Sequence, residues 1–203
     1  MSNPIVKGFW DEPTGSWQYV FYDPDTMKGA IIDPVLDFDP LAGATSTKNA
    51  QRSLNYVRAA GIELVWVLDT HPHADHFSAA HWIKAQTGAP TAIGEKVTQV
   101  QTLWQDIYNL PDDFARDGSQ WDHLFADGDE LMVGNVPVRV MFSPGHPSEA
   151  EYRAVRDARD ATLPLPKLML AALQINIRGG RLPEPENNGR SYLNLPLNYF
   201  ESR

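Results

Sequence analysis

The sequence predicts an α/β fold, and three observations support this prediction. A strand, a helix and a second strand follow one another over residues 30–68, which implies a right-handed crossover and parallel pairing of the two strands. Polar residues begin directly after the apolar run 65–68, where open α/β sheets place their chemistry. The length of 203 residues suits one substantial domain with its own core.

The first strands are predicted at residues 17–22 and 30–32, where aromatic and β-branched residues dominate. The turn Asp23-Pro24-Asp25 can join them as a hairpin. Asp33 follows the second strand and precedes Pro34. It is either a plain turn residue or a residue that supports a functional site from behind, and the sequence leaves both possibilities open.

Three helices are predicted from apolar residues at helical spacing. In the first, Ala50, Leu54 and Val57 share one face, and Gly61 is placed to end the helix. The other two cover residues 78–86 and 97–107, with a short strand at 91–93 between them. Further strands are expected at 130–133 and 136–142, joined by a tight turn at Gly134-Asn135.

The composition excludes several classes of function. The formal net charge is −9, with 17 basic and 26 acidic residues and no basic cluster, so a nucleic-acid backbone would be repelled. The absence of cysteine excludes disulfides, thiolate ligands and cysteine nucleophiles. Neither an apolar N-terminal segment nor a membrane-length apolar run is present. We therefore expect a cytoplasmic protein without nucleic-acid or membrane partners.

Four side chains that commonly bind metals follow the strand 65–68 within six residues: His71, His73, Asp75 and His76. Imidazole and carboxylate ligands at this spacing suit zinc, iron or manganese. In an extended segment residues i and i+2 point to the same side, so His71 and His73 can face one ion. Asp75 and His76 can face a second ion or the back of the first. The alternative is a surface loop in which Asp75 only caps the next helix.

The heptapeptide Thr70-His71-Pro72-His73-Ala74-Asp75-His76 resembles the T-H-x-H-x-D-H signature of the metallo-β-lactamase superfamily. Ser143-Pro144-Gly145-His146 resembles the S-P-G-H-T segment that brings in the next metal histidine, although position 147 is Pro rather than Thr. The resemblance implies an αββα sandwich. Residues 1–147 would form its first part with the metal motif, and 148–203 a C-terminal helix and extended tail of the same domain.

The second half of this sandwich is expected to be truncated. No histidine follows His146, and the segment 160–180 already resembles the C-terminal tail of the persulfide dioxygenase-like branch. An internal deletion would expose one face of the core. Prolines flank a tail rich in Leu and Ile, so we expect these side chains to be unable to bury themselves locally and the chain to form a homodimer.

The resemblance also implies a metal-dependent hydrolase or dioxygenase. It implies one transition metal, Fe(II) or Zn(II), with ligands from His71, His73, Asp75, His76 and His146, and Asp75 as the catalytic carboxylate. The implied substrate is glutathione persulfide or a related small thiol derivative. Two alternatives remain: a glyoxalase II-like thioester hydrolase, and a non-catalytic module for metal binding or dimerisation.

Overall fold

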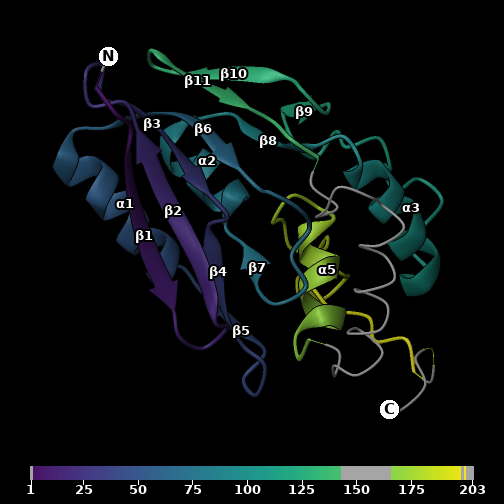
Figure 1. Cartoon of the computed structure of the whole chain (residues 1–203). Helices are drawn as coiled ribbons and strands as arrows, with labels where there is room; N and C mark the ends of the chain where they lie inside the picture. The colour runs from purple at the N-terminus through teal and green to yellow at the C-terminus, as the bar shows by residue number, and fades with distance from the viewer. Residues whose placement is uncertain (1, 143–165, 198, 200–203) are drawn as a thin grey trace, which may run out of the picture.

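A six-stranded mixed sheet forms the centre of the molecule (Figure 1). The computed structural model describes residues 2–142, 166–197 and 199. The first three strands pair antiparallel and the remaining pairs are parallel, as the crossover over residues 30–68 predicts. In spatial order the strands are β1 (Ile5–Asp11), β2 (Ser16–Tyr22), β3 (Lys28–Ile32), β6 (Glu63–Leu68), β8 (Thr91–Gly94) and β9 (His123–Phe125).

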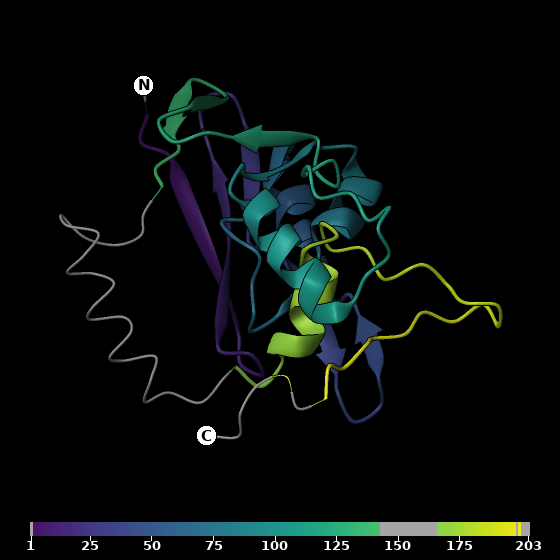
Figure 2. The ribbon, with the colours of Figure 1, turned by 90° about the vertical axis from the view of Figure 1, so that its right-hand side faces the viewer.

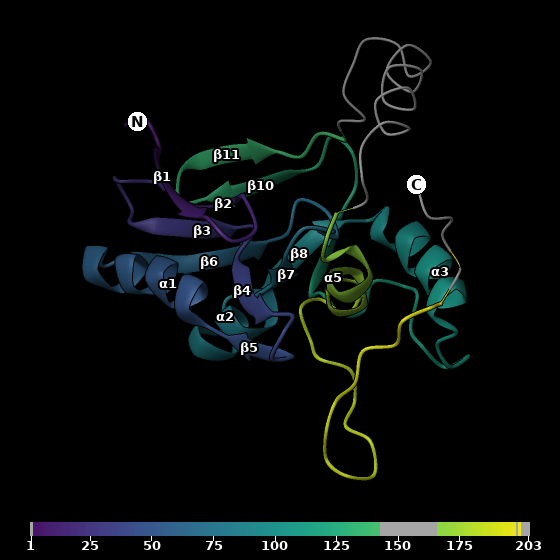
Figure 3. The same cartoon turned by 90° about the horizontal axis from the view of Figure 1, so that it is seen from below.

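Two helices cover one face of this sheet, α1 (Lys48–Ala60) and α2 (Ala80–Thr87). Figure 3 shows both on the side opposite the β10–β11 ribbon. Their apolar stripes pack on alternate strand residues such as Val20, Ile31 and Val67, which are fully buried. Gly61 ends α1 in the left-handed conformation at φ +69°, which confirms the predicted glycine cap.

The other face carries smaller elements. The ribbon of β10 (Glu130–Val133) and β11 (Val136–Arg139) packs over Ala30, Ala92 and Phe125. Trp10 and Trp17 on β1 and β2 remain 43% and 49% exposed. This face of the six-stranded sheet therefore exposes large apolar side chains, as expected. A separate three-stranded sheet has the order β5 (Ala44–Ser46), β4 (Val35–Asp39) and β7 (Phe77–Ser78).

The C-terminal segment differs from the predicted extended tail. Helix α5 (Met169–Asn176) packs between β7 and α3 (Val97–Tyr108), as Figures 1 and 2 show. Its residues Leu173 and Ile175, with the adjoining Ile177, are buried on the same chain. The expectation that these side chains cannot bury themselves locally was therefore wrong, because the prolines flank a helix instead of interrupting it.

Some sequence predictions fall on residues outside the described ranges. These are His146 with its Ser-Pro-Gly-His segment, and the helix expected after Ser148. His123, expected in a surface loop, is exposed but begins strand β9. None of the helices in the described ranges has both the length and the apolar character needed to span a membrane.

Candidate metal centre

The candidate site lies where two parallel strands end side by side. Strands β3 and β6 pair up to Ile32 and Leu68, and the N–H of Asp33 donates to the Leu68 carbonyl at 2.8 Å. Asp33 and the histidine-rich loop 70–76 therefore start from the same sheet edge. Parallel pairing makes this meeting a direct consequence of the strand order.

Loop 70–76 brings three predicted ligands into one cluster. Ligand atoms of His73, Asp75 and His76 all lie within 4.8 Å of one another. Both histidines are buried and Asp75 is half-buried. The ring of His71 is 4.1 Å from that of His73, centre to centre, but His71 lies outside the three-residue cluster and its Nδ1 is 2.9 Å from the Thr70 hydroxyl.

The two ring nitrogens of His73 each face a carboxylate. Nε2 lies 2.9 Å from Asp33 Oδ1, a close contact that is not aligned as a hydrogen bond. Asp33 therefore balances the charge of this buried ring from behind. Nδ1 of the same ring is 3.6 Å from Asp75 Oδ1. The donor set of imidazoles and a carboxylate matches the ligands that zinc and iron accept.

The electrostatics of the cluster centre on His73. Burial lowers the pKa of this imidazole, but Asp33 and Asp75 outweigh burial and raise it to about 10. Burial raises the pKa values of both carboxyls, but His73 outweighs it and holds them below their usual range. The pKa values of His71 and His76 are lowered by burial and by the charge of His73. A metal ion would therefore find two neutral imidazoles and would displace a proton from the third.

Neighbouring groups hold the ligands in place. Asp33 accepts from the Thr70 N–H at 2.7 Å and from the Thr70 hydroxyl at 2.9 Å. The Ser16 hydroxyl donates to Asp75 Oδ2 at 2.7 Å. Nδ1 of His76 is 3.0 Å from the Phe77 carbonyl, which leaves Nε2 for a metal. Of the two interpretations of Asp33, the structure supports the one in which it assists the site.

Several residues of this site were missed in the sequence. Asp69 is buried and accepts from the Ser78 hydroxyl at 2.7 Å and from the Trp121 indole at 3.2 Å. Burial raises the pKa of Asp69 to about 6 despite these hydrogen bonds. Asn176, at the end of α5, contacts the backbone of the loop. Neither residue belongs to a recognisable motif, so only the fold could identify them.

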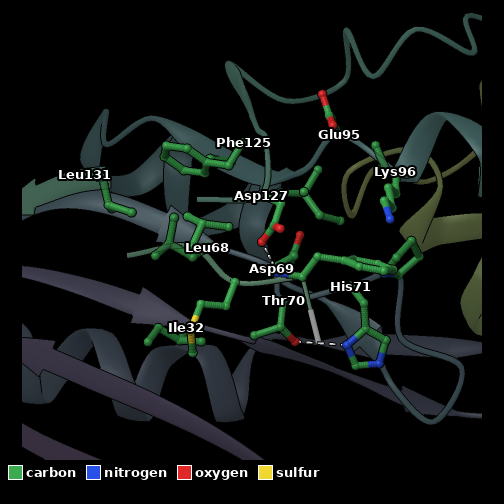
Figure 4. A pocket seen from close by; sticks show the side chains of 18 of the residues that line it. Ile32, Leu68, Asp69, Thr70, His71, Glu95, Lys96, Phe125, Asp127 and Leu131 are labelled. Atoms are coloured by element: carbon green, nitrogen blue, oxygen red, sulfur yellow. Dashed lines mark hydrogen bonds between the residues drawn. The ribbon is translucent and has the colours of Figure 1, made fainter. Parts of the chain in front are cut away.

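A pocket of about 650 Å³ adjoins the loop on the side of His71 and Thr70 (Figure 4). Most of its walls are apolar, with Leu68 and Ile32 on the sheet side and Phe125 and Leu131 beside the ribbon. The volume lies in the range of small-molecule sites. In Figure 4 the carboxylate of Glu95 points away from His71. The amino group of Lys96 and the His71 ring both lie in the right-hand half of this view.

A sequence profile of the metallo-beta-lactamase superfamily matches residues 16–153, which is more than half of the chain. The chain belongs to the metallo-β-lactamase superfamily. The solved structure of ETHE1 from Myxococcus xanthus superposes with a TM-score of 0.59 at 18% identity, covering 87% of this chain and 100% of that one. The metallo-β-lactamase α/β fold expected from the signature is therefore confirmed.

Three curated relatives of this superfamily member are informative. The Beta-lactamase hydrolase-like protein of Xylella fastidiosa is 43% identical, and the alignment covers 99% of this chain and 66% of that protein. Glyoxylase B2 of Dictyostelium discoideum is 31% identical, covering 99% and 100% respectively. Persulfide dioxygenase ETHE1 of Bos taurus is 21% identical over 70% of this chain and 44% of its own.

The lengths of these alignments bear on the expected deletion. The Xylella alignment runs over 287 positions and the Dictyostelium alignment over 291, although this chain has 203 residues. At least 84 positions of the Xylella alignment therefore have no residue in this chain. A metallo-β-lactamase-fold chain that lacks an internal segment accounts for this difference.

Proposed function

We propose that this chain binds one transition metal ion, Fe(II) or Zn(II), and acts on a small thiol-derived substrate in the manner of a persulfide dioxygenase. The observation that carries the metal site is the cluster of His73, Asp75 and His76, whose ligand atoms lie within 4.8 Å of one another. We propose His71 and His146 as the further ligands. When bound, the ion would activate water or oxygen and polarise the substrate.

The chain's own residues would prepare the site for this chemistry. Asp33 orients the His73 ring, and Ser16 orients Asp75. Asp75 is half-exposed and its pKa is lowered, so it is a carboxylate at neutral pH, which is the form that can bind the ion or accept a hydrogen bond from a water molecule beside it. The apolar pocket beside His71 would receive the body of the substrate and exclude water from its walls.

A glyoxalase II-like thioester hydrolase is the second candidate, and the 31% identity with Glyoxylase B2 favours it. A non-catalytic metal-binding or dimerisation module is the third, favoured by the alignment positions that this chain lacks. In all three we place residues 1–147 and 148–203 in one domain, since α5 packs on β7. We also propose that the protein is cytoplasmic. Because its net charge is −9, we propose that it has no nucleic-acid partner.

Metal analysis and two assays distinguish these candidates. Elemental analysis of the purified full chain should give iron for the dioxygenase and zinc for the hydrolase. Oxygen consumption with glutathione persulfide should then be measured beside hydrolysis of an acyl-glutathione thioester. We expect the dioxygenase rate to fall well below the usual enzymatic range of roughly 1 to 1000 per second, because an internal segment is missing. Metal without either activity would favour the module, and absence of any bound metal would contradict the proposal.

A further inference from the structure

The loop that carries the candidate ligands has little support from its own backbone. Within the described ranges, residues 70–76 neither donate nor accept a backbone–backbone hydrogen bond. Asp33 holds the start of this loop through Thr70. A loop without such bonds samples many conformations unless side chains fix it. At the far end, Asp33 and Ser16 hold only the side chains of His73 and Asp75, so the backbone from His73 to His76 needs a support of its own.

Asn176 provides that support. Its Nδ2 donates to the carbonyls of both His73 and His76 at 2.7 Å, and its Oδ1 accepts from the Ser78 N–H at 2.7 Å. The side chain is 2% exposed. The opposite orientation of the amide would place its oxygen against two carbonyl oxygens, so this network fixes the orientation. A carboxamide is the side chain that can donate twice and accept once at this position.

The position of Asn176 is itself fixed by packing. Ile175 and Ile177 on either side of it are fully buried, and α5 packs against β7. Gly180, at φ +81°, lies so close to β7, the strand that follows the loop, that an added Cβ would be 2.5 Å from the Ser78 carbonyl oxygen. The C-terminal segment therefore contacts the loop through Asn176 and the following strand through Gly180.

We propose that Asn176 is a positioning residue that orders the His73–His76 end of the loop before metal arrives and thereby sets the metal affinity. This inference rests on the metal site proposed above. Because Asn176 binds the carbonyls of two residues whose side chains are ligands, it fixes their backbone directions and hence the point at which the ligands converge. The C-terminal helix thus acts on the site through the loop backbone, without contact with the ion.

Helix α5 contains a matched control for this role. Gln174 is 1% exposed and also donates two hydrogen bonds to carbonyls, of Leu170 and Asn194, and accepts one from the Asn194 N–H. Its partners lie in α5 and the tail, away from the loop. The variants Asn176→Asp and Gln174→Glu therefore remove the same donors from the same helix, and only the first affects the loop.

The experiment is a Zn(II) titration of the metal-free full chain against a chromophoric chelator. We expect Asn176→Asp to raise the Kd by about 10-fold to 100-fold, and Gln174→Glu to leave it unchanged within error, although both should lower the denaturation midpoint. If Asn176→Asp does not fold, Asn176→Ala removes the same hydrogen bonds without adding a charge. Wild-type affinity in the Asn176 variant, or an equal loss in the Gln174 variant, would overturn the proposal.

Amide hydrogen exchange separates this inference from the metal site itself. In metal-free protein, amides 73–78 should exchange faster in Asn176→Asp than in the wild type, whereas Gln174→Glu should not affect them. A wild-type chain that binds no Zn(II) would refute the metal site and, with it, the effect on affinity. Even in that case, faster exchange of amides 73–78 in Asn176→Asp than in the wild type would establish that Asn176 orders the loop. Equal exchange in the two proteins would refute the ordering as well.

Discussion

The imidazole of His73 and the carboxylate of Asp33 lie in contact, with Nε2 2.9 Å from Oδ1, at the ends of two neighbouring parallel strands. The pair is almost fully buried, so neither group is satisfied by water. Asp33 also accepts both polar hydrogens of Thr70. A single carboxylate therefore joins the start of the loop to the central residue of the ligand cluster.

Replacing Asp33 should test this double role. We expect Asp33→Ala to reduce the free energy of unfolding by about 1–3 kcal/mol, because the buried His73 ring and the Thr70 N–H both lose their carboxylate partner. Urea denaturation measures this value. Asp117→Ala, at an exposed turn, should cost no more than about 0.5 kcal/mol. Equal effects of the two substitutions would show that Asp33 does not support the loop.

The ligand cluster predicts a low metal stoichiometry. We expect no more than one tightly bound transition metal ion per chain, because the described residues contain a single compact group of ligands. His73→Ala should abolish most of this occupancy, since one of the three clustered ligands is lost. His123→Ala, an exposed histidine in β9, should leave occupancy unchanged. Elemental analysis that finds two tightly bound ions would contradict the single site.

Gly180 offers a test of the contact between the C-terminal segment and β7, the strand that follows the loop. Gly180→Ala introduces a left-handed alanine at φ +81° and a Cβ against the Ser78 carbonyl oxygen. Gly189→Ala places an alanine at φ +76° with no atom within 4 Å of its Cβ. The control should cost about 1 kcal/mol through backbone strain alone, and Gly180→Ala should cost clearly more. Chemical denaturation of both variants decides, and equal costs would mean that the contact is easily relaxed.

The homodimer remains a prediction, but the structure suggests a different surface for its interface than the C-terminal tail. Because Leu173, Ile175 and Ile177 are buried on the same chain, these residues give no reason for dimerisation. The exposed aromatic side chains of Trp10 and Trp17, with Val6 at 59% exposure, form an apolar face that a second copy would cover. Light scattering should give about twice 22.7 kDa, and Trp17→Lys should shift this mass towards that of one chain. A wild-type mass of one chain would contradict the dimer.

The elements that sequence predicted well are those with local signals. The hairpin of β2 and β3, helix α1 with its cap at Gly61, and the parallel pairing of β3 with β6 were all confirmed. Each depends on apolar periodicity and on turn residues close in the chain. The heptapeptide likewise identified three residues that the structure brings together.

The residues that sequence missed depend on distant contacts. Asn176 and Asp69 act through partners from other elements, and no spacing rule connects them. Helix α5 was missed for a different reason: the prolines at 164, 166, 183 and 185 favour an extended segment. None of them falls within Met169–Asn176, which consists largely of good helix formers.

The hydrogen bonds of Asn176 to the loop join positions 98 to 103 residues apart. During synthesis the histidines therefore leave the ribosome long before the residue that orders them. Closing so long a connection carries an entropy cost that only the docking of α5 can offset. A nascent chain that ends before residue 176 would contain the candidate ligands but not the side chain that orders their backbone. We therefore expect metal capture at the proposed site to be a late event of folding, and a chain interrupted near its C-terminus to lose metal binding before it loses its central sheet.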